Sequence, residues 1–283
     1  MPLARTVRRS LTLIVALVLA GTGVYIASAV LNRNEAPVVE GCSALLNGDK
    51  QNLATDQTAN ASLITAIAVR RGLPARAATI AIATSMQEAK LRNINYGDHA
   101  GPDSRGLFQQ RPSQGWGTEA EIMDPIYSTN AFYDALVKVE GYEALSVTEA
   151  AQKVQRSGFP EAYSQHEDLG RAFASALTGN SRASLDCTLR APDAAGDPSI
   201  VRDALVRAYG TTLASVVAGR TVTVRAEGTL AWSAAQWAVA NAKGLSISRV
   251  DVDGQAWIRD GNKGWTDAQT QPGAVVITVA GAQ

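Results

Sequence analysis

The stretch that decides the fold is PARAATIAIATSMQEAKL, residues 74–91. Its proline suits the first turn of a helix, where the missing amide hydrogen costs nothing, and the residues after it predict a helix from Ala77 to Leu91. The preceding segment, ASLITAIAV at residues 61–69, carries apolar residues at helical spacing and leads to a cationic turn and a C-cap glycine, Gly72. Two consecutive helices are therefore predicted here.

Around these helices the chain is mainly helical from residue 53 to about residue 178. Residues 93–117 are polar, rich in glycine and too irregular for a helix, and their length is typical of a functional loop region. Helical patterns resume at residues 128–139, 147–155 and around 169–177. We therefore expect a mainly α domain over residues 53–189.

The N-terminus predicts export. Basic residues at 1–10 precede an uncharged, mostly apolar stretch at 11–31, which is about the 20 residues needed to cross a bilayer as a helix. No acidic residue precedes Glu35, so residues 1–10 are expected to form a cytoplasmic end. We interpret 11–31 as one transmembrane signal anchor; a signal peptide cleaved after the small residues at 27–29 is the alternative. The body is then extracytoplasmic, on a single-pass membrane protein or a secreted one.

A second module is expected after the helical domain. Residues 190–198, RAPDAAGDP, have the composition of a linker. Residues 199–283 predict a small α+β domain of accessory function, with helices at 199–218 and 231–242 and short strands beside them. This domain carries four of the five tryptophans, which predict a small core or an aromatic surface for a glycan or protein partner.

The two cysteines lie at the ends of the helical domain. Cys42 falls within residues 32–52, which we expect to be a spacer, and Cys187 falls just before the linker. An oxidising compartment favours pairing them, although two free thiols are the alternative. A bridge would close a loop of about 145 residues, to which the chain-entropy model assigns about 5 kcal/mol.

Several function classes are excluded by composition and motif. Lys+Arg and Asp+Glu balance at 26 each, and no basic run follows the N-terminus, so no nucleic-acid partner is expected. His99 and His166 are the only histidines, and neither has other ligands at metal-binding spacing. No nucleophile elbow and no phosphate-binding loop is present. The sequence predicts neither a cofactor nor a metal.

The residues that carry chemistry lie between positions 78 and 130. A helix ends at Met86-Gln87-Glu88-Ala89, Gly106-Leu107-Phe108-Gln109 follows about twenty residues later, and Asp124-Pro125 and Asn130 lie downstream. In this order and spacing the chain resembles the lysozyme-like superfamily and, within it, the lytic transglycosylases of the soluble type. The resemblance covers about 120 residues, and it implies a lysozyme-like fold for the helical domain.

The resemblance implies that Glu88 is the catalytic residue. Apolar neighbours in the sequence support this, because burial would raise the pKa of the carboxyl and keep it protonated for donation to the leaving oxygen. Enzymes of this family use the same Glu as a base on the sugar's own 6-hydroxyl, which leaves a 1,6-anhydro-muramoyl end. Ordinary glycosidases use a second carboxylate, for which Asp98 and Asp103 are the candidates.

A cleft around Glu88 is also implied. Gly106, Leu107, Phe108 and Gln109 would line it, while Tyr96 and Trp116 would stack on sugar rings or pack down on the core. The predicted substrate-binding residues are Gln109, Gly106, Leu107, Phe108, Tyr96 and Trp116. The chain departs from the family at Ala89, where Ser is usual, and the late Tyr-Asn-Gly motif has only a poor counterpart in Ala162-Tyr163-Ser164.

The predicted function is cleavage of the MurNAc–GlcNAc bond of peptidoglycan through Glu88. The expected partners are peptidoglycan glycan strands, a cell-wall or secretion complex, and the membrane through the N-terminal helix. The alternative is a non-catalytic extracytoplasmic module whose degenerate lysozyme-like cleft binds glycan or protein.

Overall fold

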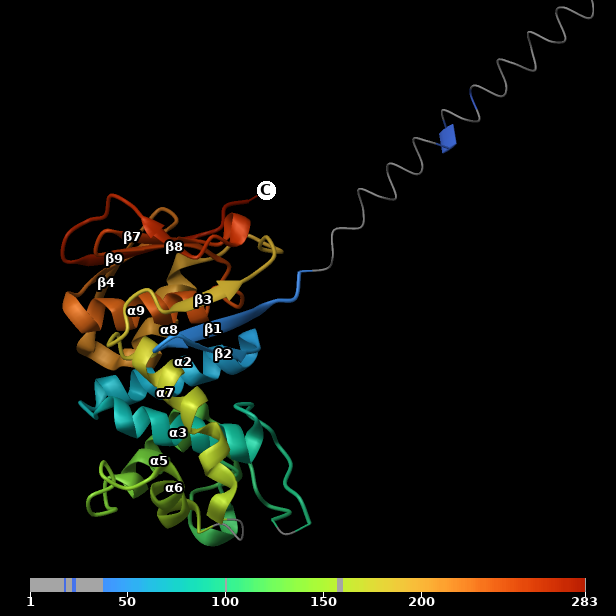
Figure 1. The fold of residues 1–283 in the computed structure, drawn as a ribbon, viewed down its shortest axis with the longest axis vertical. Coiled ribbons are helices and arrows are strands. Elements are labelled where there is room, and N and C mark those ends of the chain that lie inside the picture. The colour runs from blue at the N-terminus through green and yellow to red at the C-terminus, as the bar shows by residue number, and fades with distance from the viewer. Residues whose placement is uncertain (1–17, 19–21, 24–37, 100, 157–159, 283) are drawn as a thin grey trace, which may run out of the picture. The chain divides into compact units, whose positions relative to one another are not determined.

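The computed structural model describes residues 18, 22–23, 38–99, 101–156 and 160–282 (Figure 1). The predicted cytoplasmic end at 1–10 and nearly all of the predicted membrane segment at 11–31 lie outside these residues. Within the described part, no helix is both long and apolar enough to cross a bilayer. Val39–Gln283 forms one structural unit.

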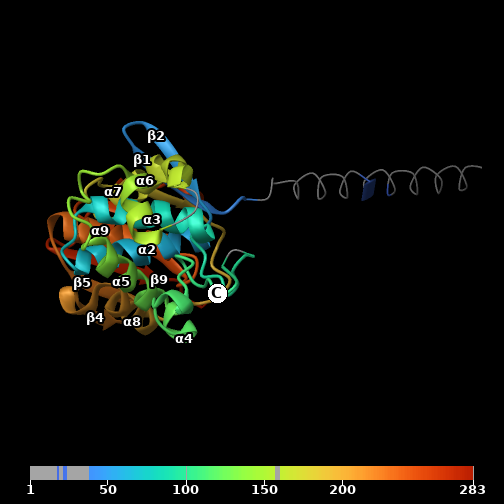
Figure 2. The same cartoon turned by 90° about the horizontal axis from the view of Figure 1, so that it is seen from below.

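The helical half of this unit is built around α3 (Ala75–Ala89), whose residues from Ala77 to Ser85 are all buried. Its small side chains let α7 (Glu167–Leu177) approach closely: a Cβ at Gly170 would lie 2.7 Å from the backbone oxygen of Thr79. The other helices around α3 are α2 (Thr55–Arg70), α5 (Pro125–Leu136) and α6 (Val147–Gln155) (Figure 2). Short helices lie between them: η1 (Pro112–Gln114), α4 (Glu119–Ile122) and η2 (Pro160–His166).

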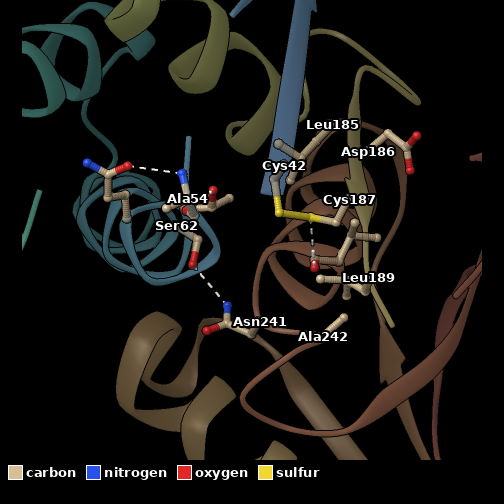
Figure 3. Close-up of a disulfide and its surroundings, with 12 residues drawn as sticks. Cys42, Ala54, Ser62, Leu185, Asp186, Cys187, Leu189, Asn241 and Ala242 are labelled. Atoms are coloured by element: carbon tan, nitrogen blue, oxygen red, sulfur yellow. Dashed lines mark hydrogen bonds between the residues drawn. A yellow bond between two sulfur atoms is a disulfide. The ribbon is translucent and has the colours of Figure 1, made fainter. Parts of the chain in front are cut away.

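A three-stranded sheet lies beside the helices. Its strands β1 (Gly41–Leu46), β2 (Asp49–Leu53) and β3 (Leu185–Thr188) pair antiparallel in the order β2-β1-β3. The strands β1 and β2 and their turn therefore cover the second half of the segment 32–52 that we expected to be a spacer. Cys42 lies opposite Cys187 in the register, and the two form a buried disulfide (Figure 3). The predicted disulfide is confirmed.

The second sheet has six antiparallel strands in the order β4-β5-β9-β6-β7-β8. They are β4 (Ala214–Ala218), β5 (Thr221–Arg225), β6 (Ile247–Val252), β7 (Gln255–Ile258), β8 (Trp265–Asp267) and β9 (Ala274–Val279). Helix α8 (Pro198–Tyr209) ends well before residue 218, because the chain turns at Gly210 with φ +63° and then enters β4. The C-terminal tryptophans belong mainly to a core: Trp232, Trp237 and Trp257 are buried.

Helix α9 (Gly228–Ala240) joins the two halves, because it packs on the six-stranded sheet and also on α2 and α7 (Figure 1). The buried side chain of Gln236 donates to the backbone oxygens of Ala176 and Ser181 at 2.6 and 2.8 Å. Its oxygen accepts from the amide of Leu185 at 2.8 Å. These bonds pair backbone groups at the end of α7 and in the segment that follows it, which would otherwise be buried without hydrogen-bond partners.

The predicted fold class is wrong. We expected a transmembrane helix, a mainly α lysozyme-like domain and a small α+β domain. The structure has 45% helix and 20% strand in two sheets, one of them with six strands, and no membrane-spanning helix among the described residues. The physical reason is that strands β1, β2 and β3 pack against the helical half, and that the buried helix α9 packs both on α2 and α7 and on the six-stranded sheet.

Candidate functional site

Glu88 lies in the last turn of α3, and the end of that helix is held firmly. Lys90 and Leu91 both adopt left-handed conformations, with φ of 52° and 53°, which turn the chain sharply away from the helix. Side chains from α2 bind the carbonyls exposed by this turn: Gln57 donates to Lys90 at 2.9 Å and Asn60 to Leu91 at 2.7 Å. These bonds fix the position of Glu88, since helix-end carbonyls need such partners.

The carboxyl of Glu88 is mostly buried and accepts hydrogen bonds from two side chains. The hydroxyl of Tyr163 donates to Oε1 at 2.6 Å, and the side chain of Gln155 also bonds to the carboxyl. Burial raises the pKa of Glu88 above its ordinary value, and the negative charge of Asp98 adds to this effect. The bonds from Tyr163 and Gln155 act in the opposite direction but do not cancel it.

Tyr163 is a site residue that the sequence interpretation missed. It is fully buried in η2, 75 positions after Glu88 in the chain. Its only sequence signal is the poor match of residues 162–164 to the late motif of the lytic transglycosylases. The structure brings this segment to the catalytic candidate because η2 packs against α3.

Gln155 links Glu88 to the loop region and to a groove. It is the last residue of α6, and its amide nitrogen donates to the backbone oxygen of Phe108 at 2.7 Å. Gln155 also lines an open groove of about 710 Å³. The remaining lining residues come from the loop around Trp116 and from the ends of α5 and α6: Gln114, Gly115, Trp116, Ala135, Lys138, Val139, Lys153, Val154 and Arg156.

The Gly-Leu-Phe-Gln segment, residues 106–109, packs against the core, and its two apolar side chains do not line the groove. Gly106 has φ +78°, and a Cβ there would lie 2.6 Å from the backbone oxygen of Ile122. The side chain of Ser85 donates to the backbone oxygen of Leu107 at 2.8 Å, which ties the segment to α3. Leu107 and Phe108 are fully buried, and Phe108 stacks on Phe132 with 4.6 Å between ring centroids. The structure places these two side chains in the core, and a role for them in substrate binding stays a prediction from the sequence.

The other predicted binding residues lie in different settings. Gln109 is half-buried, and its amide has only a long contact of 3.5 Å to the backbone oxygen of Gly106. Tyr96 is 64% exposed on the loop. Trp116 is half-buried, packs against the core and also lines the groove. Only Trp116 of the six thus lies at the groove that Gln155 connects to Glu88.

The two candidates for a second carboxylate differ. Asp103 forms an ion pair with Arg111 at 2.8 Å and accepts from the amide of Ser113 at 3.1 Å, and hydrogen bonds from Ser113 and Arg111 hold its pKa well below its usual range. Asp98 is exposed, accepts from the amide of Gly101 at 2.8 Å and acts on Glu88 through its charge. Asp98 is therefore the only one of the two whose charge acts on Glu88.

The two histidines lie in different settings. The described parts of the chain contain no group of three or more histidine, cysteine, aspartate or glutamate side chains able to hold a metal ion. His166 contacts the side-chain oxygen of Gln87 at 3.0 Å, and burial, with the nearby charge of Lys90, lowers its pKa. His99 is exposed on the loop.

Comparison with known proteins adds no family assignment: no family model matches the chain, and no curated protein matches it at a significant level.

Proposed function

We propose that this protein cleaves the glycan strands of peptidoglycan between MurNAc and GlcNAc, with Glu88 as the acid. One observation carries the proposal: Glu88 is a carboxyl whose pKa is raised by burial, and its partner Gln155 lines an open groove of about 710 Å³. Such a carboxyl retains its proton to higher pH than an exposed one and is suited to protonate the leaving oxygen of a glycosidic bond. The motif resemblance to lytic transglycosylases supports the same role.

The second half of the reaction is assigned to the same residue. Asp103 is paired with Arg111, and Asp98 accepts from the amide of Gly101, so both candidates for a second carboxylate are engaged within their own loop. After the glycosidic C–O bond breaks and its oxygen takes the proton of Glu88, the carboxylate removes the proton from the 6-hydroxyl of the muramoyl sugar. That oxygen bonds to the anomeric carbon and closes a 1,6-anhydro ring. No water is consumed, and no metal or cofactor takes part.

The proposed place of action is the cell wall, outside the cytoplasm. Peptidoglycan is extracytoplasmic, and the buried disulfide between Cys42 and Cys187 is typical of proteins that fold in an oxidising compartment. Partners beyond the glycan strand, such as a wall or secretion complex, stay predictions from the sequence.

A glycan-binding module without catalysis is the second candidate, and one observation favours it. The hydroxyl of Tyr163 and the amide of Gln155 both donate to the Glu88 carboxyl, and such bonds favour its ionised form. An ionised Glu88 would hold a sugar hydroxyl but would not donate a proton. The two candidates differ in whether covalent bonds of the strand are broken.

The test is digestion of purified peptidoglycan by full-length protein, with the released fragments identified by mass. Wild-type protein is expected to release fragments with anhydro ends, each lighter by one water than a hydrolysed fragment, and Glu88→Gln is expected to release them at least about 100-fold more slowly. The matched control is Glu143→Gln, an exposed glutamate outside the groove, which should act like wild type. Fragments with ordinary reducing ends would replace the transglycosylase assignment with hydrolysis by water. Binding without any release, by a folded wild type, would overturn cleavage and favour the binding module.

A further inference from the structure

The groove that Gln155 lines is bordered by cations. Lys138 follows α5, while Lys153 and Arg156 lie at the end of α6, and all three are exposed. The lining contains no aspartate and no glutamate. Among the described residues, none of these three cations forms an ion pair. The whole chain is neutral, with 26 basic and 26 acidic residues. The excess of three cations over no carboxylates is therefore a property of the groove lining and not of the chain as a whole.

The carboxylate of helix α6, that of Glu149, already accepts hydrogen bonds from Ser146. Glu149 lies one turn before Lys153, whose charge contributes to lowering the pKa of Glu149. However, the carboxylate of Glu149 accepts from the hydroxyl and the amide of Ser146 at 2.8 and 3.0 Å, which caps α6. The groove therefore presents its positive charge to a ligand from outside.

One residue of the groove lining, Gln155, is also a partner of the proposed catalytic carboxyl. Trp116, Val139 and Val154 give the groove an apolar wall between the cations. Its volume, about 710 Å³, is within the range of about 300–1,000 Å³ that holds ligands larger than a single sugar ring. A strand whose scissile bond lies at Glu88 would thus place its neighbouring substituents in this groove.

We propose that Lys138, Lys153 and Arg156 bind the carboxylates of the peptide stems that peptidoglycan strands carry. This inference rests on the proposed function, because it takes the strand at Glu88 to be peptidoglycan. Each stem presents free carboxylates on a short, flexible chain attached to the muramoyl sugar, and charged donors bind carboxylates through charge-assisted hydrogen bonds. The protein consequently selects strands that bear peptides over strands without them.

The test compares binding to three forms of the same peptidoglycan, freed of other wall polymers. The first is native, the second has its carboxylates converted to neutral amides, and the third has lost its peptides to an amidase. Glu88→Gln full-length protein is used, so that strands are not cleaved, and co-sedimentation measures the bound fraction. An exposed ion pair contributes a factor of about two to five, so native strands are expected to bind about tenfold more tightly than either other form.

A variant with Lys138→Gln, Lys153→Gln and Arg156→Gln should bind all three forms about equally. The matched control removes the same charge elsewhere: Arg207→Gln, Arg225→Gln and Lys263→Gln, three exposed cations that do not line the groove, should keep the tenfold preference. Equal binding of native and amidated strands by the protein with an intact groove would overturn the proposal. So would equal binding of stripped and native strands, because the carboxylate on the sugar would then suffice.

Binding and cleavage are measured separately, so their failures are distinguishable. If wild-type protein fails to release fragments but the groove variant still loses the preference for native strands, the proposed catalysis fails and carboxylate binding stands. If wild type releases fragments at the same rate from native and amidated strands, with the preference absent in binding as well, the groove proposal fails and the catalytic one stands.

Discussion

At the scale of single residues, the protonation of Glu88 results from four influences that oppose one another. Burial is the largest and raises the pKa of the carboxyl, and Asp98 acts in the same direction. Tyr163 and Gln155 lower it by donating to the carboxyl. An acid that must also act as a base in the second half of a reaction needs both groups that favour its protonated form and groups that favour its ionised form.

Replacement of Tyr163 by Phe tests this balance through the pH dependence of cleavage. Loss of the donor should raise the pKa of Glu88, so that the alkaline limb of the pH–rate profile moves to higher pH. The rate at the optimum should fall by about tenfold, because a hydrogen bond to a carboxylate contributes about 1.5–3 kcal/mol that positions the group. Tyr142→Phe, at a buried tyrosine not found at the site, is the control. An alkaline limb that stays in place or moves to lower pH would contradict the role of Tyr163.

Stability against pH gives a test that needs no substrate. Because the pKa of Glu88 is higher in the folded state than in the unfolded one, the folded state binds the proton more tightly. The stabilisation is fully present below the unfolded pKa and is lost as pH rises through the folded pKa. Glu88→Gln, which cannot ionise, should therefore gain stability relative to wild type as pH rises from about 4 to about 8. Urea unfolding at several pH values measures this, and a difference that is constant with pH would contradict the raised pKa.

At the scale of elements, local sequence signals predicted helices better than strands. The helices predicted in the first half correspond to α2 and α3, and Asp124-Pro125 is the N-cap and first residue of α5. The β1–β2 hairpin was missed although Asn47-Gly48, both with positive φ, is a strong hairpin signal. The strands beside it are short and half-polar, so their alternation is weak. The helix expected to continue to residue 218 ends at Tyr209, since β-branched residues follow in β4.

The packing of α3 on α7 is tested at Gly170. Alanine there would place its Cβ 2.7 Å from the backbone oxygen of Thr79 and push the two helices apart. Overpacking of this kind costs about 1–3 kcal/mol, and because η2 immediately precedes α7, cleavage should weaken as Tyr163 moves from Glu88. Gly244→Ala is the control, since nothing lies within 4 Å of its Cβ position. Equal urea midpoints for the two variants would show that the close approach is not required.

At the scale of the whole molecule, the site is assembled from segments that are distant in the chain. Glu88, Tyr163 and Gln155 come from α3, η2 and α6, and no local pattern predicts that they meet. The sequence predicted the cysteine pair, which is confirmed, and Glu88 as the catalytic residue, which stays a prediction. It also predicted Leu107 and Phe108 in the cleft. An apolar pair in a glycine-rich loop is typical both of a cleft wall and of a core contact, and in the structure both side chains are buried, with Phe108 stacked on Phe132.

The disulfide connects the start and the end of the helical half. Its removal tests how much it contributes to the stability of the whole unit. Cys42→Ser with Cys187→Ser removes a link across 145 residues and should lower the free energy of unfolding by about 2–5 kcal/mol. Bonds such as that from Asn241 to Ser62 at 2.9 Å, shown near the disulfide in Figure 3, still join the halves, so the variant should fold. Denaturation with and without reductant measures the effect. Wild type that unfolds at the same denaturant concentration in both conditions would contradict it.

The central claim is that the Glu88 carboxyl breaks the glycan strand by donating its proton. The most direct measurement is the rate at which wild type, Glu88→Gln and Glu143→Gln release fragments from one preparation of peptidoglycan. We predict that Glu143→Gln matches wild type and that Glu88→Gln loses about 100-fold to 10,000-fold, the usual contribution of a general acid. A Glu88→Gln protein that releases the same fragments at the wild-type rate would contradict the claim.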